Sequence, residues 1–128
     1  MMYEDKSDKV INAFYKVYNR LGYGFLEKVY QNALLIELQS MGFDVKSQYP
    51  IKVYYEEYEV GEYYADILVD DCIIIENKAM EALREEHECQ LINYLKATDI
   101  EIGLLFNFGK KPDFKRKIFT NDRKRKGI

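Results

Sequence analysis

The segment at residues 72–78, which reads CIIIENK, constrains the fold more than any other part of the chain. It is apolar on both faces until its last three residues, which is typical of a strand buried in the centre of a sheet. A helical pattern at 81–97 and a second apolar strand at 101–107 follow it. Two strands joined through a helix pair in parallel by a right-handed crossover. The sequence therefore predicts an α/β fold with a central parallel pair.

The rest of the chain shows two periodicities of its apolar residues. Helical spacing comes first, and a period of two replaces it from residue 43 onward. We therefore expect, in order, helices at 5–20 and 25–41, antiparallel strands from 43 with turns near 56–57 and 70–71, and an edge strand within 113–119. These elements complete a mixed β-sheet flanked by helices, in a single domain over residues 1–128.

The composition argues against several classes of protein. The chain is 48% hydrophobic and 32% charged, so it can bury a core, and no stretch approaches the roughly 20 apolar residues of a spanning helix. Its polar start does not resemble a signal peptide. We therefore expect a cytoplasmic protein without membrane contact. Cys72, Cys89 and the lone His87 are too few for an iron–sulfur cluster and make a zinc site improbable.

Charged residues end the central strand. Glu76 and Lys78 are two residues apart, so their side chains point to the same face. A turn at 70–71 would place Asp66 of the preceding strand nearly opposite residues 75–76. Two carboxylates beside one ammonium suit Mg²⁺ or Mn²⁺ and metal-assisted phosphodiester hydrolysis. On spacing alone, a solvated strand end is the simpler interpretation, and both interpretations stay open.

The charge is unevenly distributed along the chain. Its net value is −3, yet residues 110–128 hold nine Lys and Arg against two Asp. A basic tail on an acidic body is a candidate contact for a phosphate backbone, and a solvated terminus is the alternative. The candidate nucleic-acid contacts are Lys110, Lys111, Lys115, Arg116, Lys117, Arg123, Lys124 and Arg125.

Several segments together resemble a known family. The stretch GFLEKVYQNAL contains Gly24-x-x-Glu27-x-x-Tyr30, and YYADILVDDCIIIENKA, QLINYLKAT and IGLLFNFG follow it. As a set, these blocks resemble the GxxExxY family of the PD-(D/E)XK, or restriction-endonuclease-like, nuclease superfamily. The resemblance covers roughly residues 8–119. It departs at Ala65, where the superfamily name has proline.

The resemblance implies a restriction-endonuclease-like core and a role for each matching residue. Asp66 and Glu76 match the metal-binding carboxylates, and Lys78 matches the catalytic lysine. Glu27 matches an additional acid on an early helix, and the backbone carbonyl of Asn77 would be a further metal ligand. Without the resemblance, Glu27 would simply be an acid favoured at a helix N-terminus.

Two residues of the third predicted helix match a further motif. Gln90 and Tyr94 correspond to the Gln-x-x-x-Tyr of the exonuclease-like branch of the superfamily, which implies catalytic roles for both. A helix that packs on a sheet would show the same spacing, so a purely structural role is the alternative.

We therefore expect a metal-dependent nuclease that uses Mg²⁺ or Mn²⁺, contains no iron–sulfur cluster or zinc, and cleaves DNA rather than RNA. The alternative is a non-cleaving module that binds nucleic acid or a partner protein. Either protein could act as a homodimer or in a larger repair or defence assembly.

Overall fold

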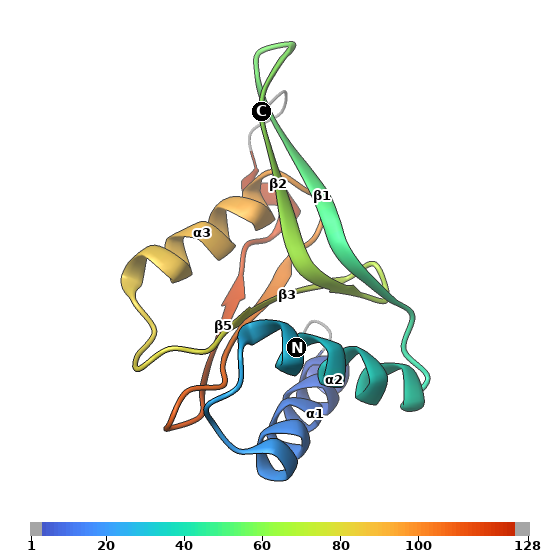
Figure 1. The fold of residues 1–128 in the computed structure, drawn as a ribbon. Coiled ribbons are helices and arrows are strands. Elements are labelled where there is room, and N and C mark those ends of the chain that lie inside the picture. Colours follow the sequence, from blue (N-terminus) through green and yellow to red (C-terminus); the bar gives the residue numbers. More distant parts are fainter. Residues whose placement is uncertain (1–3, 125–128) are drawn as a thin grey trace.

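The computed structural model describes residues 4–124 and contains a five-stranded sheet in the order β1-β2-β3-β4-β5 (Figure 1). The strands are β1 (Val45–Tyr55), β2 (Tyr58–Val69), β3 (Ile73–Lys78), β4 (Ile102–Asn107) and β5 (Asp113–Ile118). β3 pairs antiparallel with β2 and parallel with β4. The expected mixed sheet, with its central parallel pair, is therefore confirmed.

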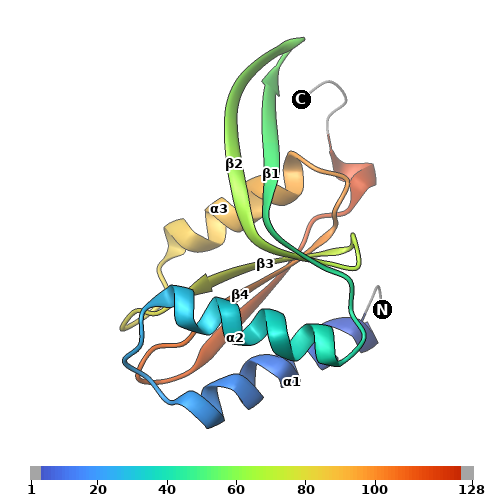
Figure 2. The same ribbon diagram turned by 45° about the vertical axis from the view of Figure 1, so that its right-hand side comes forward.

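Helices cover both faces of this sheet (Figure 2). They are α1 (Glu4–Leu21), α2 (Glu27–Ser40) and α3 (Glu85–Lys96), and a short 3-10 helix, η1 (Asn121–Arg123), follows β5. α1 and α2 lie on one face, where Phe14 stacks on Phe106 with ring centroids 4.4 Å apart. α3 lies on the other face, where Leu91 and Leu95 pack against Ile74. The double burial of β3 explains why it is apolar on both faces.

The strands β1 and β2 continue well beyond the rest of the sheet. β2 pairs with β3 only over residues 67–69, whereas its pairing with β1 extends from residue 69 back to residue 58. Residues 50–64, which we call the hairpin arm, therefore project past β3 in both views (Figures 1 and 2). β2 and β3 separate at Asp66 and Glu76, and this separation positions the site described below.

The turn between α1 and α2 depends on two residues of the Gly-x-x-Glu-x-x-Tyr motif. Gly24 has a φ of 110°, a conformation that side chains with a Cβ rarely adopt. The Tyr30 hydroxyl donates to the carbonyl of Gly22 at 2.6 Å and accepts from the N–H of Phe25 at 3.2 Å. These bonds fix the turn and place Glu27 at the first position of α2.

The third helix begins four residues later than the sequence pattern indicates. Its expected start was residue 81, but α3 begins at Glu85. The Asn107 side chain accepts from the N–H of Met80 and donates to its carbonyl, both at 3.0 Å, which holds this segment extended beside β4. The N–H of Arg84 then donates to Nδ1 of His87 at 3.1 Å and caps the helix. Contacts distant in sequence therefore override the local helical pattern.

Gly109 is expected to be indispensable for this arrangement. A Cβ at this position would overlap the carbonyl oxygen of Met80, which is a backbone atom with little freedom to move. We expect Gly109→Ala to lower the free energy of unfolding by about 1–3 kcal/mol, measured by urea denaturation. Gly61→Ala is the matched control, because its Cβ would make only an ordinary 3.7 Å contact with the Tyr63 ring. Equal stability of the two variants would contradict this role.

Candidate active site

Two carboxylates meet where β2 and β3 separate. Oε2 of Glu76 accepts the N–H of Asp66 at 2.7 Å, and Oδ2 of Asp66 accepts the N–H of Asn77 at 2.7 Å. Each carboxylate thus takes a main-chain donor of the other strand at the point where the β-ladder ends. The sequence placed these residues opposite each other, and the structure brings them together through reciprocal hydrogen bonds.

The backbone of Asp66 also leaves the ladder on its other side. Gln48 and Asp66 are unpaired, although their neighbours on both sides pair between β1 and β2. Gln48 has a φ of 53°, which costs a residue with a side chain about 1–2 kcal/mol. The carbonyl of Asp66 instead accepts from Nε2 of Gln31 at 3.4 Å. Side chains from β3 and α2 therefore replace the missing strand partners and fix this position.

The buried carboxyl of Glu76 and the half-buried carboxyl of Asp66 lie side by side and repel each other when both are charged. Burial, and then the charge of Asp66, raises the pKa of Glu76 from 4.5 to about 8. Burial likewise raises the pKa of Asp66, while the hydrogen bond from Asn77 and the charge of Lys78 act in the opposite direction. Glu76 is only 6% exposed. A proton or a cation is therefore needed at neutral pH to stabilise this pair.

Lys78 ends β3 and is half-buried. Strand alternation directs it to the face of Glu76, on which α3 lies. Its charge opposes the rise in pKa of both carboxyls. Opposite it on β4 stands Asn107, whose side chain holds the segment that follows Lys78. The lysine is therefore positioned beside the acid pair by a central strand and a fixed loop.

Glu27 lies near the acid pair but does not join it closely. It is exposed at the start of α2, and its charge contributes to the raised pKa of both Asp66 and Glu76, after the larger effect of burial. Within residues 4–124, no group of three His, Cys, Asp or Glu is close enough to hold a metal ion. The site therefore has two carboxylates that could contact a metal ion directly, and Glu27 lies farther away.

The sequence pattern did not predict a role for Gln31, which lies one helical turn after Glu27 on α2. Its side chain is 6% exposed and contacts the backbone of Asp66. Its position four residues after Glu27, on the same helix face, was the signal available in the sequence. Gln31 links the helix that carries Glu27 to the strand that carries Asp66.

α3 brings Gln90 and Tyr94 to the same face of the sheet as Glu76. Nε2 of Gln90 donates to the Tyr94 hydroxyl at 2.9 Å. Burial, and then the charges of Glu76 and Asp66, raises the pKa of Tyr94 to about 12. The hydroxyl therefore stays protonated at physiological pH and can donate a hydrogen bond near the acid pair.

The main chain of Asn77 takes part in the acid pair, whereas its side-chain amide is buried elsewhere. Its N–H binds Asp66, as described above, while its side chain points to the opposite face from Glu76 and Lys78. Both polar atoms of its side-chain amide are buried and lack a hydrogen-bond partner within the described residues.

Two of the basic residues near the C-terminus have structural partners. Lys117 in β5 forms an ion pair with Glu88 of α3 at 2.6 Å. The Lys124 ammonium donates to the carbonyls of Thr98 and Ile100, both at 2.8 Å. These bonds tie β5 to α3 and Lys124 to the segment before β4, so neither cation is a free charge.

Two other basic residues lie closer to the site. Lys111 and Lys115 are exposed and line a hollow of about 370 Å³ together with Asn107, the residue opposite Lys78. The remaining candidates are Lys110 before β5, Arg116 within β5, and Arg123, which lies over the ring of Phe119 at 4.5 Å. Arg125 lies outside the described residues. Much of the basic stretch is thus part of the sheet rather than a separate tail.

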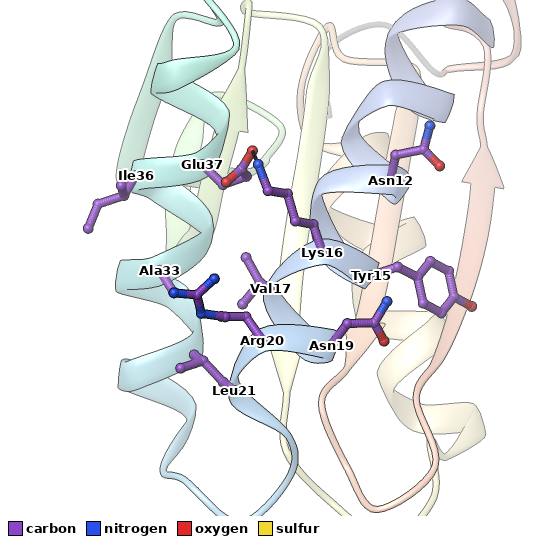
Figure 3. A pocket seen from close by; sticks show the side chains of 10 residues that line it. All are labelled: Asn12, Tyr15, Lys16, Val17, Asn19, Arg20, Leu21, Ala33, Ile36 and Glu37. Atoms are coloured by element: carbon purple, nitrogen blue, oxygen red, sulfur yellow. Dashed lines mark hydrogen bonds and ion pairs between the residues drawn. The ribbon is translucent and has the colours of Figure 1, made fainter.

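A hollow of about 800 Å³ lies between α1 and α2 (Figure 3). Arg20, Val17 and Ala33 lie in its floor and walls, and Lys16 forms an ion pair with Glu37 across it at 3.0 Å. None of the residues that the sequence singled out lines it. We therefore place the candidate active site at the acid pair and not in this larger hollow.

The fold and the site define an α/β protein with two strand-end carboxylates and a neighbouring lysine. The sequence matches the model of the PD-(D/E)XK nuclease superfamily over residues 4–117. The chain therefore belongs to the PD-(D/E)XK nuclease superfamily.

A solved structure shows the same fold. The crystal structure of SSO0001 superposes with a TM-score of 0.61 at 18% sequence identity, covering 94% of this chain. The chain spans 62% of the length of that protein. No curated protein sequence matches the chain significantly. Among residues 4–124, no helix has the length and apolar character needed to cross a bilayer.

Proposed function

We propose that this protein is a metal-dependent nuclease whose active site is the Asp66–Glu76 pair with Lys78. The main support is the reciprocal hydrogen bonding of the buried Glu76 and the half-buried Asp66 at a strand separation. Beside them stands Lys78, whose ammonium forms no hydrogen bond or ion pair within residues 4–124. A purely structural strand end would expose these charges to water or pair them with a cation. Their burial side by side costs stability, which is typical of a functional site.

The residues present fit Mg²⁺ or Mn²⁺. Asp66 and Glu76 supply hard oxygen ligands, and Mg²⁺ is commonly held by one or two carboxylates, with water and substrate phosphate completing its shell. We propose the carbonyl of Asn77 as a further ligand and Glu27 as a contact through water. When bound, the metal would lower the pKa of the attacking water and offset charge on the scissile phosphate.

The protein's own groups would then orient the reaction. Lys78 would hold the attacking water or accept its proton, and its charge would stabilise the phosphate as negative charge builds on it. The Tyr94 hydroxyl, held by Gln90, would donate to a phosphate oxygen or orient Lys78. Gln31 would keep Asp66 in place through its backbone contact.

Finer assignments rest on the sequence pattern. We assign the chain to the GxxExxY group because Gly24 and Tyr30 build the turn that positions Glu27. DNA stays the expected substrate and the cytoplasm the expected location. A homodimer or a larger repair or defence assembly stays a prediction.

Lys111 and Lys115 are the basic residues that we expect to contact the phosphate backbone. Replacing both by glutamine should reduce the slope of log affinity against log salt by about 2, since each phosphate contact contributes about 1. The measurement is fluorescence anisotropy with a labelled oligonucleotide, at salt concentrations between about 50 and 200 mM. Lys9→Gln with Lys16→Gln on α1 is the matched control. An unchanged slope in the first variant would remove these lysines from the interface.

A cleavage screen tests the proposed function. Single-stranded DNA, double-stranded DNA and single-stranded RNA are incubated with the protein in Mn²⁺ and, separately, in EDTA. We expect cleavage of DNA that requires the metal. Metal-dependent binding of nucleic acid without cleavage of any substrate would favour the alternative, a module that acts with a partner.

A further inference from the structure

A second feature adjoins the acid pair: a groove of about 670 Å³ between the hairpin arm and α3. In Figure 2, α3 crosses behind the β1 and β2 strands that form the arm. Val53 and Tyr63 line the groove from the arm, and His87, Gln90, Asn93 and Tyr94 line it from α3. Its walls are therefore largely apolar and aromatic, with amide and imidazole groups between them.

Two tyrosine rings meet in this groove. Tyr63 and Tyr94 have ring centroids 5.7 Å apart and an interplanar angle of 46°. Tyr94 is 5% exposed and therefore fixed in the core, whereas Tyr63 is 49% exposed. The groove thus has a buried, anchored ring and a second ring that is half exposed to solvent.

The groove leads to the acid pair. Tyr94, which lines the groove, packs in the same buried cluster as Ala65, the residue before Asp66, and Ile74, two residues before Glu76 on the same face of β3. The charges of Glu76 and Asp66 contribute to the raised pKa of Tyr94, after the larger effect of burial. A chain segment that lies in the groove would therefore have its next backbone group close to Asp66 and Glu76.

The chemistry of the groove favours a base over a phosphate. Its charged lining residues, Glu86 and Lys96, have opposite signs, so it offers no net attraction to an anion. Aromatic faces stack on any nucleobase, and side-chain amides can bind base edges. The arm tip is also acidic, with Glu56 and Glu57 at the turn, which disfavours a phosphate backbone along it.

We propose that the groove binds an unpaired nucleobase of the substrate strand, stacked on Tyr63, next to the phosphate that is cleaved. The proposal rests on the proposed function in taking nucleic acid as the ligand. Bases within a duplex stack on one another and cannot enter a groove of this kind. The substrate class is therefore nucleic acid with an unpaired nucleotide beside the scissile bond, either in a single strand or at an overhang.

Stacking can be measured without cleavage. The probes are DNA oligonucleotides with one 2-aminopurine, placed in a single strand, in an overhang or in the centre of a blunt duplex. The full chain is titrated into each probe in EDTA, and the strands are checked for integrity on a gel. We expect 2-aminopurine fluorescence to be quenched in the single strand and the overhang but not in the duplex centre.

Variants of the arm decide the role of Tyr63. Tyr63→Leu should weaken binding of the single strand by about 5- to 100-fold, from the usual contribution of one stacked base, and Tyr63→Phe should restore it. Tyr64→Leu is the matched control, because Tyr64 is 50% exposed on the adjacent position and the opposite face of the same strand. Melting temperatures check that each variant is folded.

The outcomes separate this inference from the proposed function. Quenching that depends on Tyr63 supports the base site even if no substrate is cleaved in Mn²⁺. Metal-dependent cleavage with equal binding by folded Tyr63→Leu and Tyr64→Leu would overturn the base site and leave the nuclease assignment intact. Quenching of the duplex-centre probe equal to that of the single strand would overturn the requirement for an unpaired base.

Discussion

Replacing Lys78 by alanine is expected to slow cleavage by about 10²–10⁴-fold while leaving the fold intact. Lys78 is half-buried at the end of β3, and its ammonium forms no hydrogen bond or ion pair within residues 4–124. Its removal therefore breaks no hydrogen bond or ion pair of this side chain in the described structure. It does remove the cation that acts on both Asp66 and Glu76.

The measurement is a single-turnover cleavage rate on the substrate identified by the screen, with circular dichroism as the test of folding. Lys28→Ala is the matched control. Lys28 is exposed on α2 and its charge also acts on Asp66, but it does not lie at the strand end. We expect this control to retain most of the activity. A folded Lys78→Ala protein that cleaves at the normal rate would contradict the proposed mechanism.

Glu76→Gln should have two opposite effects: it should abolish metal binding and stabilise the metal-free protein at alkaline pH. Burial and the charge of Asp66 raise the pKa of Glu76 to about 8 in the folded state, against 4.5 as its ordinary value. The folded protein therefore binds a proton more tightly than the unfolded chain. The stability from this group is fully present below about pH 4.5 and is lost as the pH rises through about 8.

Glutamine is neutral at every pH and avoids this loss. Each unit of pKa shift corresponds to about 1.4 kcal/mol, so the difference should reach a few kcal/mol above pH 8. The measurement is thermal unfolding in EDTA from pH 5 to 9. We expect the two melting curves to converge near pH 5 and the Glu76→Gln protein to melt higher at pH 9. Glu57→Gln, at the exposed arm tip, controls for the loss of a charge, and parallel pH profiles of all three proteins would refute the buried pair.

Local pattern was sufficient to predict the framework of the fold. The apolar run in β3 predicted its central position, and the helix between β3 and β4 predicted their parallel pairing, because both follow from burial and chain handedness. The turn at Asp70 and Asp71 was also predictable; both have positive φ angles in the structure. The reciprocal position of Asp66 and Glu76 followed from that turn.

Features that depend on distant contacts were not predictable. α3 starts late because Asn107 holds Met80, 27 residues away in sequence. Gln31 donates to the carbonyl of Asp66, 35 residues away in sequence, and the sequence of α2 does not indicate this partner. The groove beside Tyr63 exists only because the hairpin arm passes α3. The pattern of a single sequence indicates which face of a helix or strand is apolar, but it does not indicate which two faces pack together.

The most direct test of the central claim is a Mn²⁺ titration of the wild-type protein and of Asp66→Asn, followed by melting temperature. Ligand at about 100 times its dissociation constant should stabilise the folded state by about 2.7 kcal/mol. We expect Mn²⁺ to raise the melting temperature of the wild type but not of Asp66→Asn. Asp71→Asn, in the exposed turn between β2 and β3, is the control and should respond as the wild type does. A wild-type protein that Mn²⁺ does not stabilise, or an equal rise in Asp66→Asn, would contradict a metal site at Asp66 and Glu76.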